Sequence, residues 1–183
     1  MATYRLDPRE IATPRVDDCA ALWPNLHDAE LRAHVAVEEH YLTFHRRLLG
    51  SLQANMGLEQ GFQPIDWSLR AGMIRASVIL FGSIAEAVLL DHAAARQMQH
   101  PRKGRVTLAG RWTLGTLTNV WATAGSAEYD QIRADVESLR DMRNNIHLSR
   151  AVADRHRWQD VIAAEEALVE AGDRVIAALR TFV

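Results

Sequence analysis

The most constraining feature of this sequence is a long apolar stretch at residues 73–90. Its apolar side chains fall on nearly all sides of a helix, and a helix of this kind is normally surrounded by others. The stretch is long enough to consider as a membrane span, but Arg75 and Glu86 lie inside it and its flanks carry no clear anchoring pattern. It therefore predicts the central helix of a soluble bundle, without a membrane partner.

Four further segments space their apolar side chains three and four residues apart, as amphipathic helices do. They lie at about residues 27–55, 114–124, 126–147 and 158–182. Short connections between such helices favour antiparallel packing, and the sequence carries no alternating strand pattern. The expected fold class is all-α, an antiparallel bundle of about five helices.

The domain expected from this pattern is a single one over residues 27–183. Residues 1–26 look irregular because three prolines interrupt them, with room for one short turn at residues 17–23. They also carry too many charges for the apolar core of a signal peptide. Cys19 is the one cysteine, so no intrachain disulfide is possible, and a reducing cytoplasm is the expected location.

The helix expected at residues 126–147 changes character along one of its faces. At 100° per residue, with Arg140 at zero, His147 lies at about −20°, Arg143 at about −60° and Asn144 at about +40°. Two turns earlier the same stripe holds residues that look like core positions. Polar groups that continue a buried face are costly unless they are paired or used, so this stripe is the candidate functional site.

The residue types on this stripe suit the cleavage of RNA. Histidine titrates near neutral pH, so His147 can move a proton on or off a ribose hydroxyl. Arginine can hold a phosphate and stabilise charge on its oxygens, which is the role expected of Arg140. Asn144 can orient the imidazole, and Arg143 can assist with the substrate or the structure. This chemistry needs no cofactor and no metal.

Residues 139–148 resemble the signature helix of the HEPN superfamily. The motif of that family is an arginine, usually followed by a polar residue, with four to six residues before a histidine. Arg140 is followed by Asp141, and six residues lie between Arg140 and His147. The central helix with Glu86 is similar to the long preceding helix of the HEPN fold. The resemblance covers about residues 66–150, and only the fourth helix carries a specific motif.

The resemblance implies a HEPN-like fold and a metal-independent endoribonuclease. HEPN domains commonly form homodimers in which two motif helices build one composite site. Many act as toxins in toxin–antitoxin systems or in phage defence, so RNA and an antitoxin or other protein are the partners implied. On this reading Asp141 belongs to the substrate-binding set with Arg143, and Glu86 supports the site through an ion pair with Arg140.

A rival interpretation is a non-catalytic dimeric regulator or adaptor that uses the same groove for binding. The segment from residue 114 to residue 147 is also similar to the mannitol operon repressor family, which shares a helical bundle with an arginine in its fourth helix. On this view the arginines form a structural network with acidic neighbours such as Glu86 or Glu137. A second arginine–histidine match, Arg150 with His156, lacks the polar residue after the arginine.

Residues 96–111 hold five basic side chains and no acidic one, in a chain whose net charge is −2. The net charge excludes a globally basic nucleic-acid binder, but Arg102, Lys103 and Arg105 of this loop can steer RNA towards the site if the loop lies near the motif helix. The alternative is a solvated loop. The histidines of the first long helix stand five and six residues apart, a spacing that does not suit a metal site.

Overall fold

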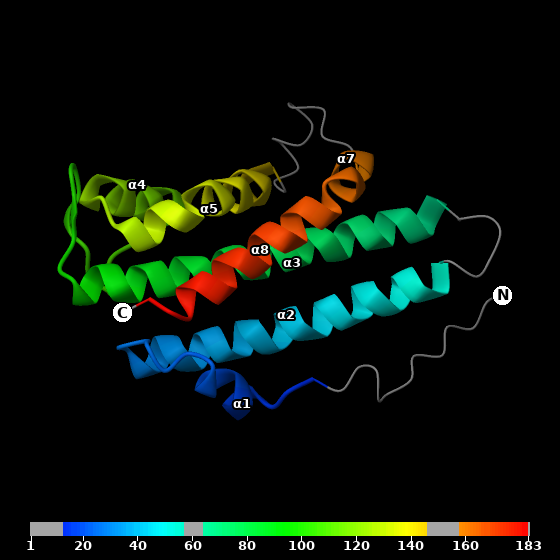
Figure 1. The fold of residues 1–183 in the computed structure, drawn as a ribbon, viewed down its shortest axis with the longest axis horizontal. Coiled ribbons are helices and arrows are strands. Elements are labelled where there is room, and N and C mark those ends of the chain that lie inside the picture. The colour runs from blue at the N-terminus through cyan, green and yellow to red at the C-terminus, as the bar shows by residue number, and fades with distance from the viewer. Residues whose placement is uncertain (1–12, 57–63, 146–157, 183) are drawn as a thin grey trace.

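The computed structural model describes residues 13–56, 64–145 and 158–182, which form an all-α bundle with one small hairpin (Figure 1). The elements in chain order are α1 (Val16–Ala21), α2 (Ala29–Met56), α3 (Pro64–Ala95), β1 (Gln99–His100), β2 (Gly104–Arg105), α4 (Leu114–Ala124), α5 (Ala127–Asn145), α7 (Trp158–Ala163) and α8 (Glu165–Leu179). The all-α prediction is thereby confirmed, with more helices than the five expected.

Helix α3 occupies the centre of the bundle. It contacts α2 on one side and α4, α5, α7 and α8 on the others, so its apolar residues are covered from several directions (Figure 1). The segment Arg70–Ala95 is long and apolar enough to cross a membrane by length and composition, and half of its most apolar window is buried inside the bundle. Its position among five other helices favours the core helix of a soluble bundle, as predicted.

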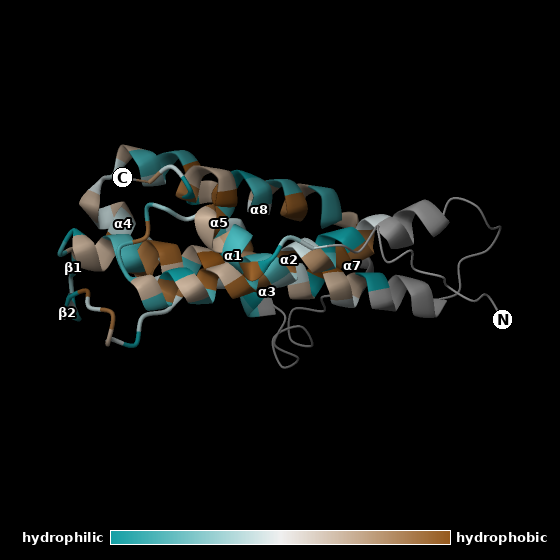
Figure 2. Ribbon diagram, turned by 90° about the horizontal axis from the view of Figure 1, so that it is seen from below, coloured by the Kyte–Doolittle hydropathy of each residue, from teal (hydrophilic) through white to brown (hydrophobic). Residues whose placement is uncertain are grey.

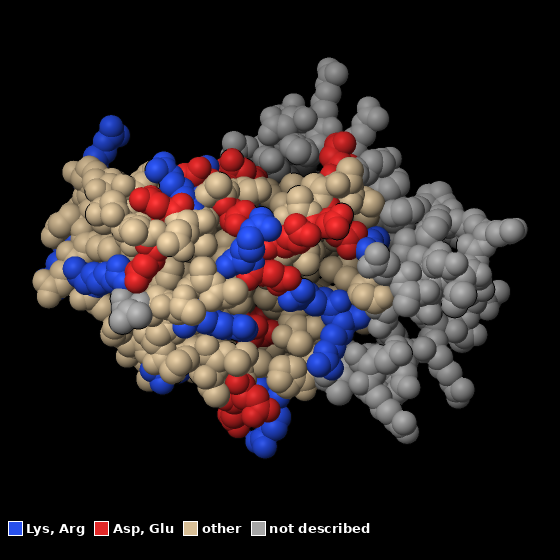
Figure 3. All heavy atoms as spheres, viewed as in Figure 1, with Lys and Arg blue, Asp and Glu red and all other residues tan. Residues whose placement is uncertain are grey.

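The core is built around large side chains from every part of the chain. Trp23, Phe81, Trp121, Tyr129 and Phe182 are all at most 1% exposed. Hydrophobic residues alternate with hydrophilic ones around the outer helices, as expected for amphipathic helices that share one core (Figure 2). Arginine–carboxylate pairs then link the outer surfaces of α2, α5 and α8, and acidic and basic side chains are interspersed on the face seen in Figure 3.

Most helix boundaries agree with the sequence pattern, and α4 agrees at both ends. Thr113 caps its first turn through a bond from the Thr116 amide, and Gly125 ends it in the left-handed region at φ 65°. The last helix differs from the prediction, because Ala164 separates α7 from α8. The hairpin of β1 and β2 was not expected, since two-residue strands are too short to show alternation.

The segment before α2 belongs to the bundle from residue 16 onward, where one short turn at residues 17–23 of an otherwise irregular segment was expected. Helix α1 forms there, and Trp23 and Leu26 are buried in the main core. The Asn25 amide nitrogen donates to the carbonyls of Leu179 and Phe182 at 2.9 and 3.0 Å. The α1–α2 linker is therefore fastened to the end of α8.

Candidate functional site

Helix α5 carries the polar stripe, and its sequence explains why it is a helix. Glu128 and Asp130 stand in its first turn, where negative charge stabilises the positive end of the helix dipole. Tyr129 and Val136 are fully buried in the core, as the sequence pattern predicts for this part of the face. The face then becomes half-buried and polar in the last two turns.

Arg143 is held in a fixed position by α3. Its Nη1 donates to Glu86 Oε2 at 2.8 Å, and its side chain crosses Gly82, where an added Cβ would lie 3.2 Å from Arg143 Cδ. Gly82 and Glu86 are four residues apart and so share one face of α3. The glycine makes room for the stem of the arginine, and the glutamate holds its charge.

Glu86 also determines where α4 begins. The same Oε2 accepts a hydrogen bond from the Leu114 amide at 2.7 Å. Leu114 is the first residue of α4, and the first amides of a helix have no acceptor within it. Leu114 itself is 2% exposed, so water does not satisfy its amide. A single carboxylate therefore joins α3, the start of α4 and the end of α5.

Arg140 has a looser setting than Arg143. Its Nε and Nη2 donate to Asp141 Oδ1 at 3.0 and 2.8 Å, and the Asp141 side chain is 64% exposed. The Arg140 stem lies against Gly115 of α4, where an added Cβ would be 3.6 Å from Arg140 Cδ. The expected ion pair between Glu86 and Arg140 is thus not the one that forms. Arg143 reaches Glu86, and Arg140 turns to its exposed neighbour.

The half-buried polar face, defined here as Glu86, Arg140, Asp141, Arg143 and Asn144, is the candidate site. These residues come from the last two turns of α5 and from the middle of α3, beside the beginning of α4. His147 lies outside the described residues, as do Arg150 and His156 of the second motif match. The described members of the stripe, Arg140, Arg143 and Asn144, all lie in the last two turns of α5.

The Tyr129 hydroxyl lies near the same face but is not available for proton transfer at neutral pH. Burial raises the pKa of Tyr129 to about 12, and the Glu137 carboxylate adds to the rise, while the Arg133 and Arg140 guanidinium groups oppose it. The hydroxyl oxygen is buried and has no hydrogen-bond partner. Tyr129 is therefore a neutral member of the core.

The basic loop lies at the other end of α5. Arg96, just before the hairpin, pairs with Glu128 in the first turn of α5 at 2.9 Å. Glu128 and Arg140 are separated by about 18 Å along the helix axis. Exposed Arg102, Lys103 and Arg105 are on the hairpin, so the structure does not bring them to the candidate site.

Two features of the site were not singled out from the sequence. The side chains of Arg143 and Arg140 lie against Gly82 and Gly115. A glycine inside a predicted helix often marks the close approach of another part of the chain, and this was the one sequence signal for these contacts. A second cluster away from this site, formed by His27, Asp91 and His92, was also missed because His27 is 64 residues from Asp91 in the chain. No protein-family model, curated protein or solved structure matches this chain.

Proposed function

We propose that this chain is a HEPN-like, metal-independent endoribonuclease whose site is the half-buried polar face of α5 together with His147. The observation that carries the proposal is the setting of Arg140, whose charge is held by an exposed neighbouring carboxylate. Ion pairs of this kind contribute about 0–1 kcal/mol. A phosphate that offers bidentate, charge-assisted bonds can therefore displace Asp141.

In the proposed reaction the 2′-oxygen of a ribose forms a bond to the adjacent phosphorus and the bond to the 5′-oxygen breaks. His147 acts as general base or general acid for the protons that leave the 2′-hydroxyl and reach the 5′-oxygen. Arg140 binds the phosphate and stabilises its developing charge. Asn144 orients one of these groups, and Arg143 holds the helix end through Glu86.

The wider proposal follows the resemblance to HEPN proteins. The active form is a homodimer in the cytoplasm, with two α5 helices meeting at one composite site. The protein acts as the toxin or effector of a toxin–antitoxin or phage-defence system and binds RNA and a protein partner. The hairpin residues Arg102, Lys103 and Arg105 contact RNA phosphates away from the cleavage point.

The test is RNA cleavage in EDTA by wild type, Arg140→Ala and His147→Ala. We expect wild type to cleave total RNA and each variant to lose at least about 100-fold in rate, the lower end of what general acid–base catalysis contributes. Arg133→Ala is the matched control, because Arg133 is an exposed arginine of the same helix paired with Glu137. Circular dichroism confirms that each protein is folded in EDTA. Equal cleavage by wild type and His147→Ala contradicts the catalytic assignment.

The second candidate function is the non-catalytic dimeric regulator or adaptor, and the Glu86–Arg143 pair favours it. A charge that is already neutralised inside the molecule serves the structure rather than a substrate. On this interpretation wild type cleaves no RNA, and Arg140→Ala weakens dimerisation instead. Analytical ultracentrifugation of wild type and Arg140→Ala, beside the cleavage assay, separates the two functions.

A further inference from the structure

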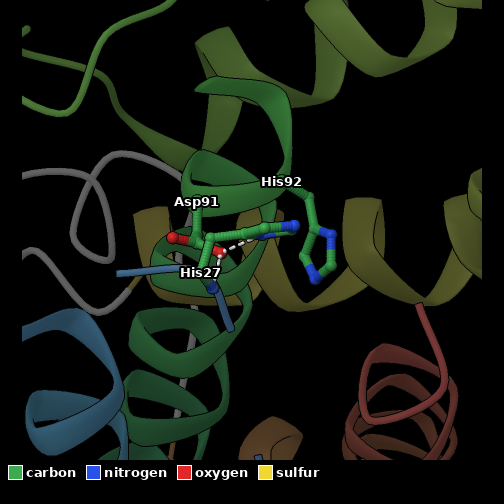
Figure 4. Close-up of side chains that lie close together, drawn as sticks. All are labelled: His27, Asp91 and His92. Atoms are coloured by element: carbon green, nitrogen blue, oxygen red, sulfur yellow. Dashed lines mark hydrogen bonds and ion pairs between the residues drawn. The ribbon is translucent and has the colours of Figure 1, made fainter. Parts of the chain in front are cut away.

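A second polar cluster lies at the end of α3, away from the stripe of α5. His27 comes from the linker between α1 and α2, and Asp91 and His92 come from the last turns of α3 (Figure 4). One ring nitrogen of each histidine and one carboxylate oxygen all lie within 4.8 Å of one another. The cluster thus joins two segments that are 64 residues apart.

Asp91 is a buried carboxylate that is held firmly in one orientation. Its side chain is 1% exposed, and its oxygens accept bonds from the amides of His27 and Asp28 at 2.8 and 2.9 Å. The same Oδ2 that accepts from the His27 amide lies 2.9 Å from His27 Nδ1 (Figure 4). A carboxylate fixed in this way needs little reorganisation to accept a cation.

His92 is fully buried and incompletely bonded. Its Nδ1 has no hydrogen-bond partner, and its Nε2 lies 3.4 Å from the Asn25 amide nitrogen. That nitrogen has two protons, and the Leu179 and Phe182 carbonyls take them at shorter distances. A neutral imidazole has one N–H donor and one lone pair, and the lone pair can accept a hydrogen bond or bind a metal ion. An imidazole lone pair without a donor, deep in a protein, is costly unless something binds it.

His27 gives the cluster access to solvent. Its side chain is 54% exposed, and its ring meets that of His92 edge to face at 5.1 Å between centroids. An ion can therefore reach the buried pair from the His27 side. Asp91 and His92 also stand near the carboxyl end of α3, where the helix dipole favours positive charge.

We propose that His27, Asp91 and His92 bind one Zn²⁺ ion, with solvent as the fourth ligand. Two imidazoles and one carboxylate are a ligand set that suits zinc, whereas Mg²⁺ and Ca²⁺ prefer oxygen alone. Tetrahedral zinc with bonds of about 2.0–2.1 Å places its ligand atoms about 3.3 Å apart. The ligand atoms lie within 4.8 Å of one another, so no pair has to close by more than about 1.5 Å on binding.

The zinc site is independent of the proposed ribonuclease site, because the two share no residue. Zinc would fasten the α1–α2 linker to the end of α3, next to the contact of Asn25 with the end of α8. Its role is thus to stabilise the fold. A protein that binds zinc but cleaves no RNA refutes only the function proposed above, and the reverse result refutes only the zinc site.

The test is a titration of the full chain, stripped with EDTA and dialysed, with Zn²⁺ by calorimetry and with Co²⁺ by visible absorption. We expect one ion per chain, the intense absorption of tetrahedral Co²⁺, and a rise in melting temperature with Zn²⁺. His27→Ala, which removes an exposed side chain, should weaken binding by more than the roughly 10–100-fold that loss of an outer-shell partner costs.

His34→Ala is the matched control, since His34 is an exposed histidine of α2 whose nearest carboxylate is 3.9 Å away. It should bind zinc as wild type does. Asp91→Asn and His92→Gln should abolish the Co²⁺ absorption, and circular dichroism identifies any variant that fails to fold. The zinc site is refuted if wild type binds no ion at micromolar concentrations, or if His27→Ala binds as tightly as His34→Ala.

Discussion

Replacing Glu86 by alanine removes the carboxylate that joins α3, α4 and α5. The largest loss is at the Leu114 amide, which is buried and would have no acceptor in place of Glu86 Oε2. A buried donor without a partner costs about 1–3 kcal/mol. The ion pair with Arg143 adds about 0–1 kcal/mol, because both side chains are a quarter to a third exposed.

We therefore expect Glu86→Ala to reduce the free energy of unfolding by about 1–4 kcal/mol. For a domain of this size the melting temperature falls by about 2–4 °C per kcal/mol, so the expected drop is about 2–16 °C. Arg143→Met keeps most of the stem against Gly82 and removes only the charge. It should cost no more than about 1 kcal/mol, since Glu86 still accepts from Leu114.

The assay is urea unfolding followed by circular dichroism, with the double variant completing a cycle. The expected coupling between Glu86 and Arg143 is about 0.5–1 kcal/mol. Glu137→Ala, which breaks an exposed pair with Arg133, is the control and should cost under about 0.5 kcal/mol. If Glu86→Ala lowers the free energy of unfolding no more than Arg143→Met does, the hydrogen bond from the Leu114 amide to Glu86 does not stabilise the start of α4.

Two further predictions concern the core. Gly172→Ala should destabilise the protein by about 1–2 kcal/mol in the same assay, because the added Cβ would lie 2.5 Å from ring carbons of buried Phe81. This overpacking outweighs the better helix propensity of alanine. The control Gly50→Ala, on an exposed part of α2 with nothing within 4 Å, should gain about 0.5–1 kcal/mol, and a loss of the same size at both positions would contradict the steric explanation. Tyr129→Phe should raise stability by up to about 1 kcal/mol at pH 7, because it removes a buried hydroxyl without a partner. The substitution should also reduce the pH dependence of the free energy of unfolding above about pH 10. The pKa of Tyr129 is about 12 in the folded protein and near 10 in the unfolded chain, so wild type loses stability as pH rises between these values. The variant has no such group. Equal slopes for both proteins from pH 10 to 12 would refute the assignment to Tyr129.

The fold could be predicted wherever local pattern and burial agree. The apolar stretch of α3 has no polar side to expose to solvent, so its pattern predicts a helix at the centre of the bundle. Helix α4 has a threonine before its first turn and Gly125 after its last, and these signals act within a few residues. The break at Ala164 has no such signal, because alanine favours the helix that it interrupts.

The partners within the candidate site could not be predicted. Arg140 and Arg143 stand about 60° apart on α5, and either can face α3 in a helical-wheel projection. Which one reaches Glu86 depends on the rotation of α5 and on the space above Gly82, and neither is visible in a one-dimensional pattern. The meeting of His27 with Asp91 likewise depends on the packing of α2 against α3.

The fastening of Asn25 to Leu179 and Phe182 also bears on how the chain folds. It joins residues 154 and 157 positions apart, and long-range contacts of this kind form late because closing the loop costs entropy first. During synthesis Trp23 must wait for α8 to emerge, since Arg180 stacks over its ring at 5.5 Å. Until then the Trp23 indole, which is fully buried in the folded bundle, is not covered by Arg180, so the nascent chain exposes apolar surface that favours aggregation before α8 is made.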